Sequence, residues 1–153
     1  MNGFYTITQS LFSELTKAGF RVVTLGDYLK IDLKRQTIFP YAHIIPQVSN
    51  PVDNVGAMTF TIVGMDLVDF NKNDLRDEDE PFFNTDNLQD ILNDIHNRFE
   101  VVIEQYKRGI AFSDLLQLNS EPSFDPFMER FENLLAGWEV TIVIKYPNNA
   151  PIC

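Results

Sequence analysis

The segment from Gly137 to Pro147 constrains the fold most, because its side chains alternate in character along the chain. Polar residues occupy most of the positions between the apolar ones. Such alternation is typical of a strand with one buried face in an antiparallel sheet. Proline cannot donate a hydrogen bond to a neighbouring strand, so Pro147 is expected to end it. The apolar positions are Trp138, Val140, Ile142, Ile144 and Tyr146.

The chain is long enough for one domain with a hydrophobic core, since it has 153 residues and 13 of them are Phe. We therefore expect a single domain over residues 1–153, with a C-terminal tail at 147–153. The formal net charge of −10 argues against a general affinity for nucleic acid or anionic membranes, although it leaves open that DNA passes close by.

No segment predicts secretion or membrane insertion. The first residues lack the basic and apolar regions of a signal peptide, and no apolar run approaches the roughly 18 residues of a spanning helix. Cys153 is the single cysteine, so an internal disulfide is excluded. We expect a soluble protein made in a reducing cytoplasm.

Two segments predict amphipathic helices. Apolar residues recur every three or four positions over Phe4–Ala18, and Gly19 follows where a left-handed residue is needed. The same spacing continues over Leu88–Lys107, with Asp86 and Gln89 forming a variant capping box at its start.

Extended segments surround these helices. Phe20–Leu25 predicts a short strand, and the alternating residues 28–33 suggest a hairpin partner for it. A long β-hairpin is expected around Ala42–Phe70, long enough for part of it to project as an arm. Pro40 and Pro46 indicate an edge strand or bulges in its first half, and Gly64 suggests a bulge or bend in its second.

The sequence pattern leaves the secondary structure of the region before the last strand less certain than that of the other segments. A short strand is expected near Leu115–Leu118. Residues 127–136 fit the apolar face of a helix and an extended, turning segment equally well, so both alternatives stay open.

The acidic segment at residues 71–86 is expected to be a surface loop. Asp69, Asn71, Asn73, Asp77 and Glu80 match ligand positions of a calcium loop of the EF-hand type. However, Asp74 occupies the position that requires glycine, and a strand rather than a helix is expected before the loop. We therefore interpret the segment as a solvated loop and predict no metal site and no cofactor.

No group of residues in the sequence matches a catalytic motif. His43 and His96 are the only histidines, and each is expected to be partly buried and hydrogen-bonded rather than to act as a general base. The sequence contains no nucleophile elbow and no glycine-rich phosphate loop. We therefore expect that the chain is not an enzyme.

Aromatic residues are placed near loops and strand ends, where they predict either satellite core packing or a subunit interface. The sequence alone does not choose between these two alternatives. The set is Phe39, Tyr41, Phe70, Phe82, Phe83, Phe112, Phe124 and Phe127.

Several stretches, taken in their order along the chain, resemble small virion proteins of tailed bacteriophages. The proteins that they resemble are tail terminators and tail-completion proteins of the head–tail interface. These stretches are 24–27 (TLGD), 34–40 (KRQTIFP) with His43-Ile44, Met65-Asp66 in a long strand, and 126–138 (PFMERFENLLAGW) before an alternating strand. The likeness covers nearly the whole chain, and Gly137-Trp138 with the segment before it is its most distinctive part. The motifs are structural, and the family offers no functional residues to transfer.

The resemblance implies an α+β fold, with a curved, mainly antiparallel sheet flanked by the two helices. It implies a structural protein that forms a ring, a hexamer or a dodecamer, at the head–tail interface of the virion after assembly in the host cytoplasm. The ring would join neighbouring neck and tail proteins, while double-stranded DNA passes through its lumen without specific binding. The alternative is a non-ring phage assembly or host-interaction module.

An acidic lumen would repel the phosphates of passing DNA. We therefore expect part of the acidic segment, with the two aromatic residues after it, to face the channel or a neighbouring ring. These interface or lumen candidates are Asp74, Asp77, Glu78, Asp79, Glu80, Phe82 and Phe83.

Overall fold

The computed structural model describes residues 3–27, 39–52, 55–67, 88–107, 116–130 and 135–147. Within these ranges the chain forms an α+β fold, as expected, with two helices and a six-stranded sheet. The elements in order are α1 (Gly3–Lys17), β1 (Val22–Leu25), β2 (Tyr41–Val52), β3 (Val55–Leu67), α2 (Leu88–Lys107), β4 (Gln117–Leu118), β5 (Ser123–Arg130) and β6 (Leu135–Pro147).

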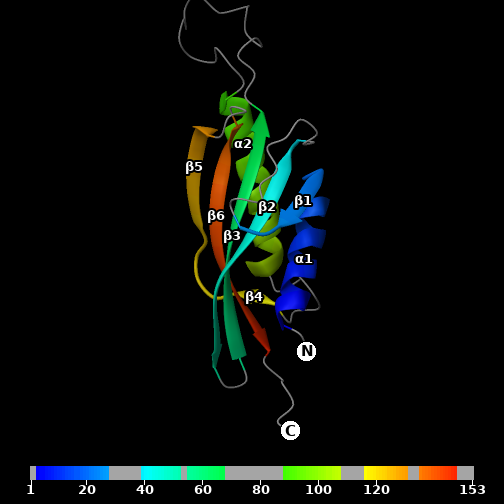
Figure 1. The fold of residues 1–153 in the computed structure, drawn as a ribbon, viewed down its shortest axis with the longest axis vertical. Coiled ribbons are helices and arrows are strands. Elements are labelled where there is room, and N and C mark those ends of the chain that lie inside the picture. The colour runs from blue at the N-terminus through cyan, green and yellow to red at the C-terminus, as the bar shows by residue number, and fades with distance from the viewer. Residues whose placement is uncertain are drawn as a thin grey trace, which may run out of the picture.

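The sheet is mixed but mostly antiparallel, with the strand order β1-β2-β3-β6-β4 (Figure 1). β1 pairs with β2 in parallel, and every other pair is antiparallel. β5 and β4 both pair with β6, β5 along residues 135–141 and β4 at residues 144–145. The long β2–β3 hairpin is confirmed. However, β3 pairs with β6 along its whole length, so it does not leave the sheet as a separate arm.

The predicted apolar face of the last strand is confirmed as the face on which both helices pack (Figure 1). Burying this surface supplies the main stabilisation of the fold, since apolar burial is the dominant favourable term in folding. The Trp138 indole adds a direct tie, because Nε1 donates to the Leu92 carbonyl of α2 at 2.8 Å. The sheet residues buried on this side include Ala42, Ile44, Phe60, Ile62, Val140, Ile142, Ile144 and Tyr146.

The end of α1 is fixed by Gly19, which has φ of +102°. The amide of Gly19 donates to the Thr16 carbonyl and that of Phe20 to the Leu15 carbonyl, a Schellman arrangement. A side chain at Gly19 would meet Arg98, whose Nη1 atom donates to the Ala18 carbonyl at 3.0 Å. The predicted helix stop is thus confirmed, and a residue of α2 reinforces it.

Gly64 does not form the predicted bulge. It pairs regularly with Ala42 on one side and with Trp138 on the other. The register shift lies instead between Pro46 and Ser49 in β2, as the prolines indicated. Gly64 is required for packing, because an added Cβ would lie 2.5 Å from the ring of Phe99 on α2.

A second cluster is buried on the opposite face of the sheet, and it settles part of the aromatic question. Tyr41 and Phe127 belong to it, and Phe39 packs against it, while Phe124 packs against the main core. For these four residues, core packing is confirmed. The cluster consists of Tyr41, Ile45, Val63, Met65, Phe127 and Leu135.

The ambiguity before the last strand is resolved in favour of extended structure, since β5 runs to Arg130 and β6 begins at Leu135. Asp86 of the capping box, the predicted hairpin partner at 28–33, the calcium-like positions, Phe70 and Phe112 lie outside the described residues. So do all the interface or lumen candidates: Asp74, Asp77, Glu78, Asp79, Glu80, Phe82 and Phe83.

Candidate binding groove between helix α2 and strand β5

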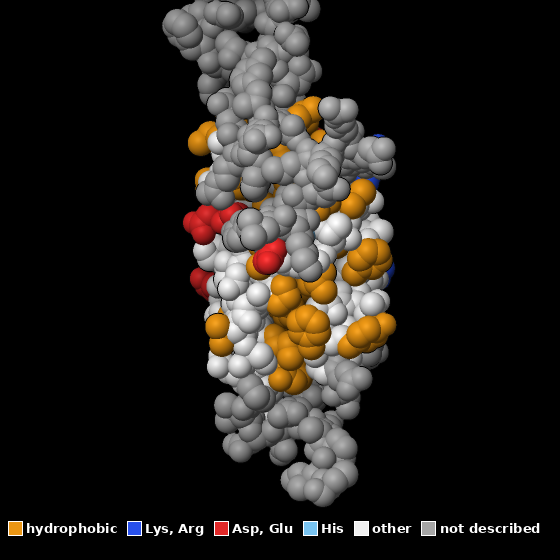
Figure 2. Space-filling model, in the orientation of Figure 1, with side chains coloured by type: hydrophobic (Ala, Val, Ile, Leu, Met, Phe, Trp, Pro, Cys, Tyr) orange, Lys and Arg blue, Asp and Glu red, His pale blue; other side chains and the backbone are white. Residues whose placement is uncertain are grey.

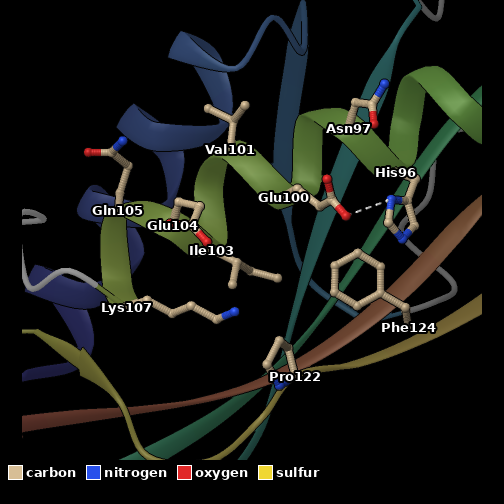
Figure 3. A pocket seen from close by; sticks show the side chains of 10 residues that line it. All are labelled: His96, Asn97, Glu100, Val101, Ile103, Glu104, Gln105, Lys107, Pro122 and Phe124. Carbon is tan, nitrogen blue, oxygen red and sulfur yellow. Dashed lines mark ion pairs between the residues drawn. The ribbon is translucent and has the colours of Figure 1, made fainter.

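An open groove of about 670 Å³ runs along α2, beside the start of β5 (Figure 3). Helical spacing brings one side of α2 into it, and Pro122 and Phe124 form the opposite wall. Val101 at its rim is 53% exposed, so the groove offers apolar contact area to a partner. The residues that line it are His96, Asn97, Glu100, Val101, Ile103, Glu104, Gln105, Lys107, Pro122 and Phe124.

His96 is held at one end of the groove by two aromatic rings and a carboxylate. Its ring centroid lies 4.8 Å from that of Phe124 and 5.0 Å from that of Trp138. Its Nδ1 atom lies 3.3 Å from Oε1 of Glu100, one helical turn further along α2 (Figure 3). The predicted partial burial of this histidine is therefore confirmed, and the Glu100 carboxylate is its polar neighbour.

The groove offers both apolar and polar contacts to a partner. Its lining combines apolar walls with two glutamates, one lysine and two amide side chains. The contact between His96 and Glu100 joins residues four positions apart on one helix, which is a common surface pair. This mixture fits a peptide or protein segment with both apolar and polar side chains.

A second, smaller hollow of about 220 Å³ lies between α1 and β1. Thr8, Gln9 and Phe12 of α1 form one side, and the other comes from β1 with Ile44 of β2. Phe12 is 50% exposed and Leu25 is 46% exposed. This hollow therefore presents apolar surface beside the strand that ends the sheet.

His43 belongs to a buried network that joins β1 to β2. Its Nε2 atom lies 2.8 Å from the carbonyl oxygen of Asp27, which can only accept, so Nε2 carries the proton. In the neutral ring Nδ1 then accepts from the Thr24 hydroxyl at 2.6 Å, and Thr24 contacts the Tyr41 hydroxyl. The predicted hydrogen-bonded role is confirmed, and the network anchors the four-residue strand β1.

Asp66 is the one carboxyl in the described residues for which a raised pKa is resolved. Burial is the largest cause, and the nearby charge of Asp94 adds to it. The backbone amide of Leu67, with Arg98 and Arg21, acts in the opposite direction. Asp66 lies near the end of β3 and lines neither the groove nor the smaller hollow. Its raised pKa therefore affects the stability of the fold rather than a binding site.

No group of three or more His, Cys, Asp or Glu side chains in the described part of the chain lies close enough together to hold a metal ion. Neither α1 nor α2 has the length and apolar character needed to cross a bilayer.

Sequence patterns identified the two histidines but not the groove. The groove depends on β5 being a strand that places Phe124 against α2, and residues 127–136 were ambiguous between helix and strand. A usable signal was Pro126, because proline suits an edge strand and disfavours the interior of a helix.

No protein-family model matches the sequence, and no curated protein is significantly similar to it.

Proposed function

We propose that this chain is a structural subunit of a ring at the head–tail interface of a tailed bacteriophage. The ring joins the tail to the neck and surrounds the DNA channel, and the protein transforms no substrate. The sequence resemblance suggests this role, and the α+β fold with a curved sheet is of the class that the resemblance implies.

The observation that carries the proposal is a sheet whose two sides end in different strands, β1 on one side and β4 with β5 on the other. Within the described residues, β1 has a strand partner on one side only, and so has β5 at the opposite side of the sheet. Different edges on opposite sides allow head-to-tail contacts between identical copies, which close into rings when the rotation permits. Strand addition at exposed sheet edges is an established mode of protein association.

The charge of the chain supports a DNA-conducting rather than a DNA-binding ring. With a net charge of −10, the subunit as a whole repels phosphates. Weak attraction between lumen and DNA is needed for rapid passage, so an acidic protein fits this position.

The test uses mass measurement at two levels. Native mass spectrometry and negative-stain images of the purified protein should show a closed ring. Mass spectrometry of purified particles of the encoding phage should detect the protein at a copy number that matches the ring. A monomer that is absent from purified particles would contradict the proposal.

That contradictory outcome would favour the second candidate, a non-ring assembly or host-interaction module. The specific observation behind it is the open groove of about 670 Å³ between α2 and β5, which suits a partner segment. A module of this kind should bind its partner as a monomer, and Val101→Glu in the groove should weaken that binding.

A further inference from the structure

Helix α1 carries a second stripe of uncharged side chains beside the one that enters the core. The buried stripe consists of Ile7, Leu11 and Leu15, with Ser10 at its border. The members of the second stripe recur every three or four positions, so they lie on one side of the helix. Apolar surface on two sides is typical of a helix that is covered on both. The second stripe consists of Tyr5, Thr8, Phe12 and Thr16.

The aromatic members of this stripe project beside the smaller hollow. Tyr5 is 64% exposed, and Phe12 is 50% exposed. Thr8, Gln9 and Phe12 border the hollow of about 220 Å³, and the exposed Leu25 lies on its other side. Figure 2 shows hydrophobic side chains along the margin where α1 and β1 lie in Figure 1. A protruding aromatic ring and a hollow thus lie one to two turns apart on the same helix.

The two threonines of the stripe need no hydrogen bond from whatever covers them. The Thr8 hydroxyl donates to the carbonyl oxygens of Phe4 and Tyr5, 3.0 Å from each. The Thr16 hydroxyl donates to the Phe12 carbonyl at 2.8 Å. An apolar occupant therefore leaves neither hydroxyl donor unsatisfied. Tyr5 can keep its polar tip in water at the edge of the contact while its ring is covered.

Charge favours a second copy of this chain as the occupant. Among the described residues, those that form the stripe or line the hollow carry no charge. Each subunit has a formal net charge of −10, so two copies repel each other where their acidic surfaces meet. Figure 2 shows acidic side chains gathered toward the margin opposite α1. Contact through α1 therefore brings two copies together with little repulsion.

The stripe is also complementary to itself. Positions 5 and 12 are equally distant from the level between Thr8 and Gln9 along the helix. If two copies of α1 pack antiparallel about a two-fold axis at that level, Tyr5 of each copy lies opposite Phe12 and the hollow of the other. Both copies then contribute the same patch, as an isologous interface requires. Antiparallel packing also places opposite ends of the two helix dipoles side by side.

The area of the patch suits a weak, reversible pair. A large aromatic side chain buries roughly 200 Å², so the half-exposed Tyr5 and Phe12 offer about 100 Å² each. Gln9, Thr16 and Leu25 are also exposed and enlarge the patch. The total stays at the low end of specific interfaces, which begin near roughly 1,200 Å² over both partners. Such a pair can separate when the chain enters a larger assembly.

We propose that α1 of one copy packs antiparallel against α1 of a second copy, with Tyr5 of each in the hollow beside Phe12 of the other. The pair covers the stripe in the free protein. This contact does not depend on the proposed ring function. Without a ring it gives a dimer, and with a ring it joins two rings face to face.

Charge substitutions test which residues face each other. Phe12→Glu should weaken pairing by about tenfold, because it places a carboxylate against the apolar ring of Tyr5 in the other copy. Tyr5→Lys should weaken pairing similarly. The double variant should recover most of the pairing, since lysine then faces glutamate at both ends of the symmetric contact. Sedimentation velocity at several protein concentrations measures the pairing. Met128→Glu is the control, because Met128 is an exposed apolar residue on β5, at the side of the sheet opposite β1.

A single cysteine tests the position of the axis. Gln9→Cys in a Cys153→Ser background should give a disulfide-linked dimer under oxidation, because position 9 of both copies lies at the level of the axis. Lys17→Cys in the same background is the matched control, since Lys17 is 70% exposed on the same helix. Its two copies lie roughly 25 Å apart along the antiparallel helices, at about 1.5 Å per residue. That separation exceeds the roughly 7 Å between Cα atoms that a disulfide can span, so this variant should stay monomeric on a non-reducing gel.

The outcomes separate the α1 contact from the proposed ring. Pairing that both single charge variants leave unchanged, or equal cross-linking of Gln9→Cys and Lys17→Cys, would overturn the α1 contact and leave the ring standing. A protein that pairs through α1 but forms no ring and is absent from particles would overturn the ring and leave the α1 contact standing. Stripe variants with an unchanged oligomeric state that fail to enter particles would show that another protein covers the stripe, which also overturns the α1 contact. Circular dichroism melting checks that each variant stays folded.

Discussion

At the residue scale, Asp66 shows how a partly buried carboxylate lowers the stability of the native state. Its pKa is raised above the ordinary value of 3.8, chiefly by burial and then by the charge of Asp94. The folded state therefore holds the proton more tightly than the unfolded state does. Ionised Asp66 costs stability as the pH rises from 3.8 through the raised pKa, and the cost disappears at lower pH.

We predict that Asp66→Asn stabilises the protein at neutral pH, by less than about 1 kcal/mol because the group is partly exposed. The asparagine oxygen can still accept from the Leu67 amide, as Oδ1 of Asp66 does at 2.7 Å. Urea unfolding at pH 7 and at pH 3.5 measures the effect. The gain should be present at pH 7 and absent at pH 3.5, and a gain that is larger at pH 3.5 would contradict this account.

At the scale of elements, one buried hydrogen bond joins the two helices. The Ser10 hydroxyl of α1 lies 2.8 Å from the Tyr106 hydroxyl of α2, and both side chains are buried. Burial raises the pKa of Tyr106, and the hydrogen bond to Ser10 acts against that rise. The pair therefore satisfies two polar groups that would otherwise oppose helix packing.

We predict that Ser10→Ala destabilises the protein by about 1–3 kcal/mol, because it leaves the Tyr106 hydroxyl buried without its partner. Ser10→Ala combined with Tyr106→Phe should cost less than the sum of the two single variants, since both polar groups are then gone. Urea unfolding followed by circular dichroism gives the coupling. Thr8→Ala, which removes an exposed hydroxyl from the same helix, is the control and should be nearly neutral. Strict additivity would show that the bond contributes nothing.

At the scale of the whole molecule, assembly brings together subunits that each carry a net charge of −10. Salt screens this repulsion, since the Debye length falls from about 10 Å at 0.1 M to about 3 Å at 1 M ionic strength. Strand addition between sheet edges is built from main-chain hydrogen bonds and apolar side chains, which salt does not weaken.

We therefore predict that raising NaCl from about 0.1 M to about 1 M strengthens ring assembly of the wild-type protein. Sedimentation velocity at several protein concentrations measures the shift toward the oligomer. Sodium sulfate at matched ionic strength should act in the same direction, because it also favours apolar burial. Dissociation by salt would show that ion pairs between subunits dominate the contact and would count against assembly through sheet edges.

The sequence by itself determined the elements whose periodicity is long and regular. Both helices, the alternating face of the last strand and the long hairpin were predicted close to their observed bounds, because a repeated apolar spacing specifies which face is buried. Gly19 also ended its helix as predicted. These features depend on neighbours along the chain, which the sequence displays directly.

Only the tertiary structure decided the role of Gly64, the strand nature of residues 123–130 and the two hollows beside α1 and α2. Each depends on contacts between segments far apart in the sequence: Gly64 is small because Phe99 of α2 packs on it. The groove beside His96 exists because β5 brings Phe124 against α2. Local spacing carries no record of such distant pairings, so they become visible only when the chain is folded.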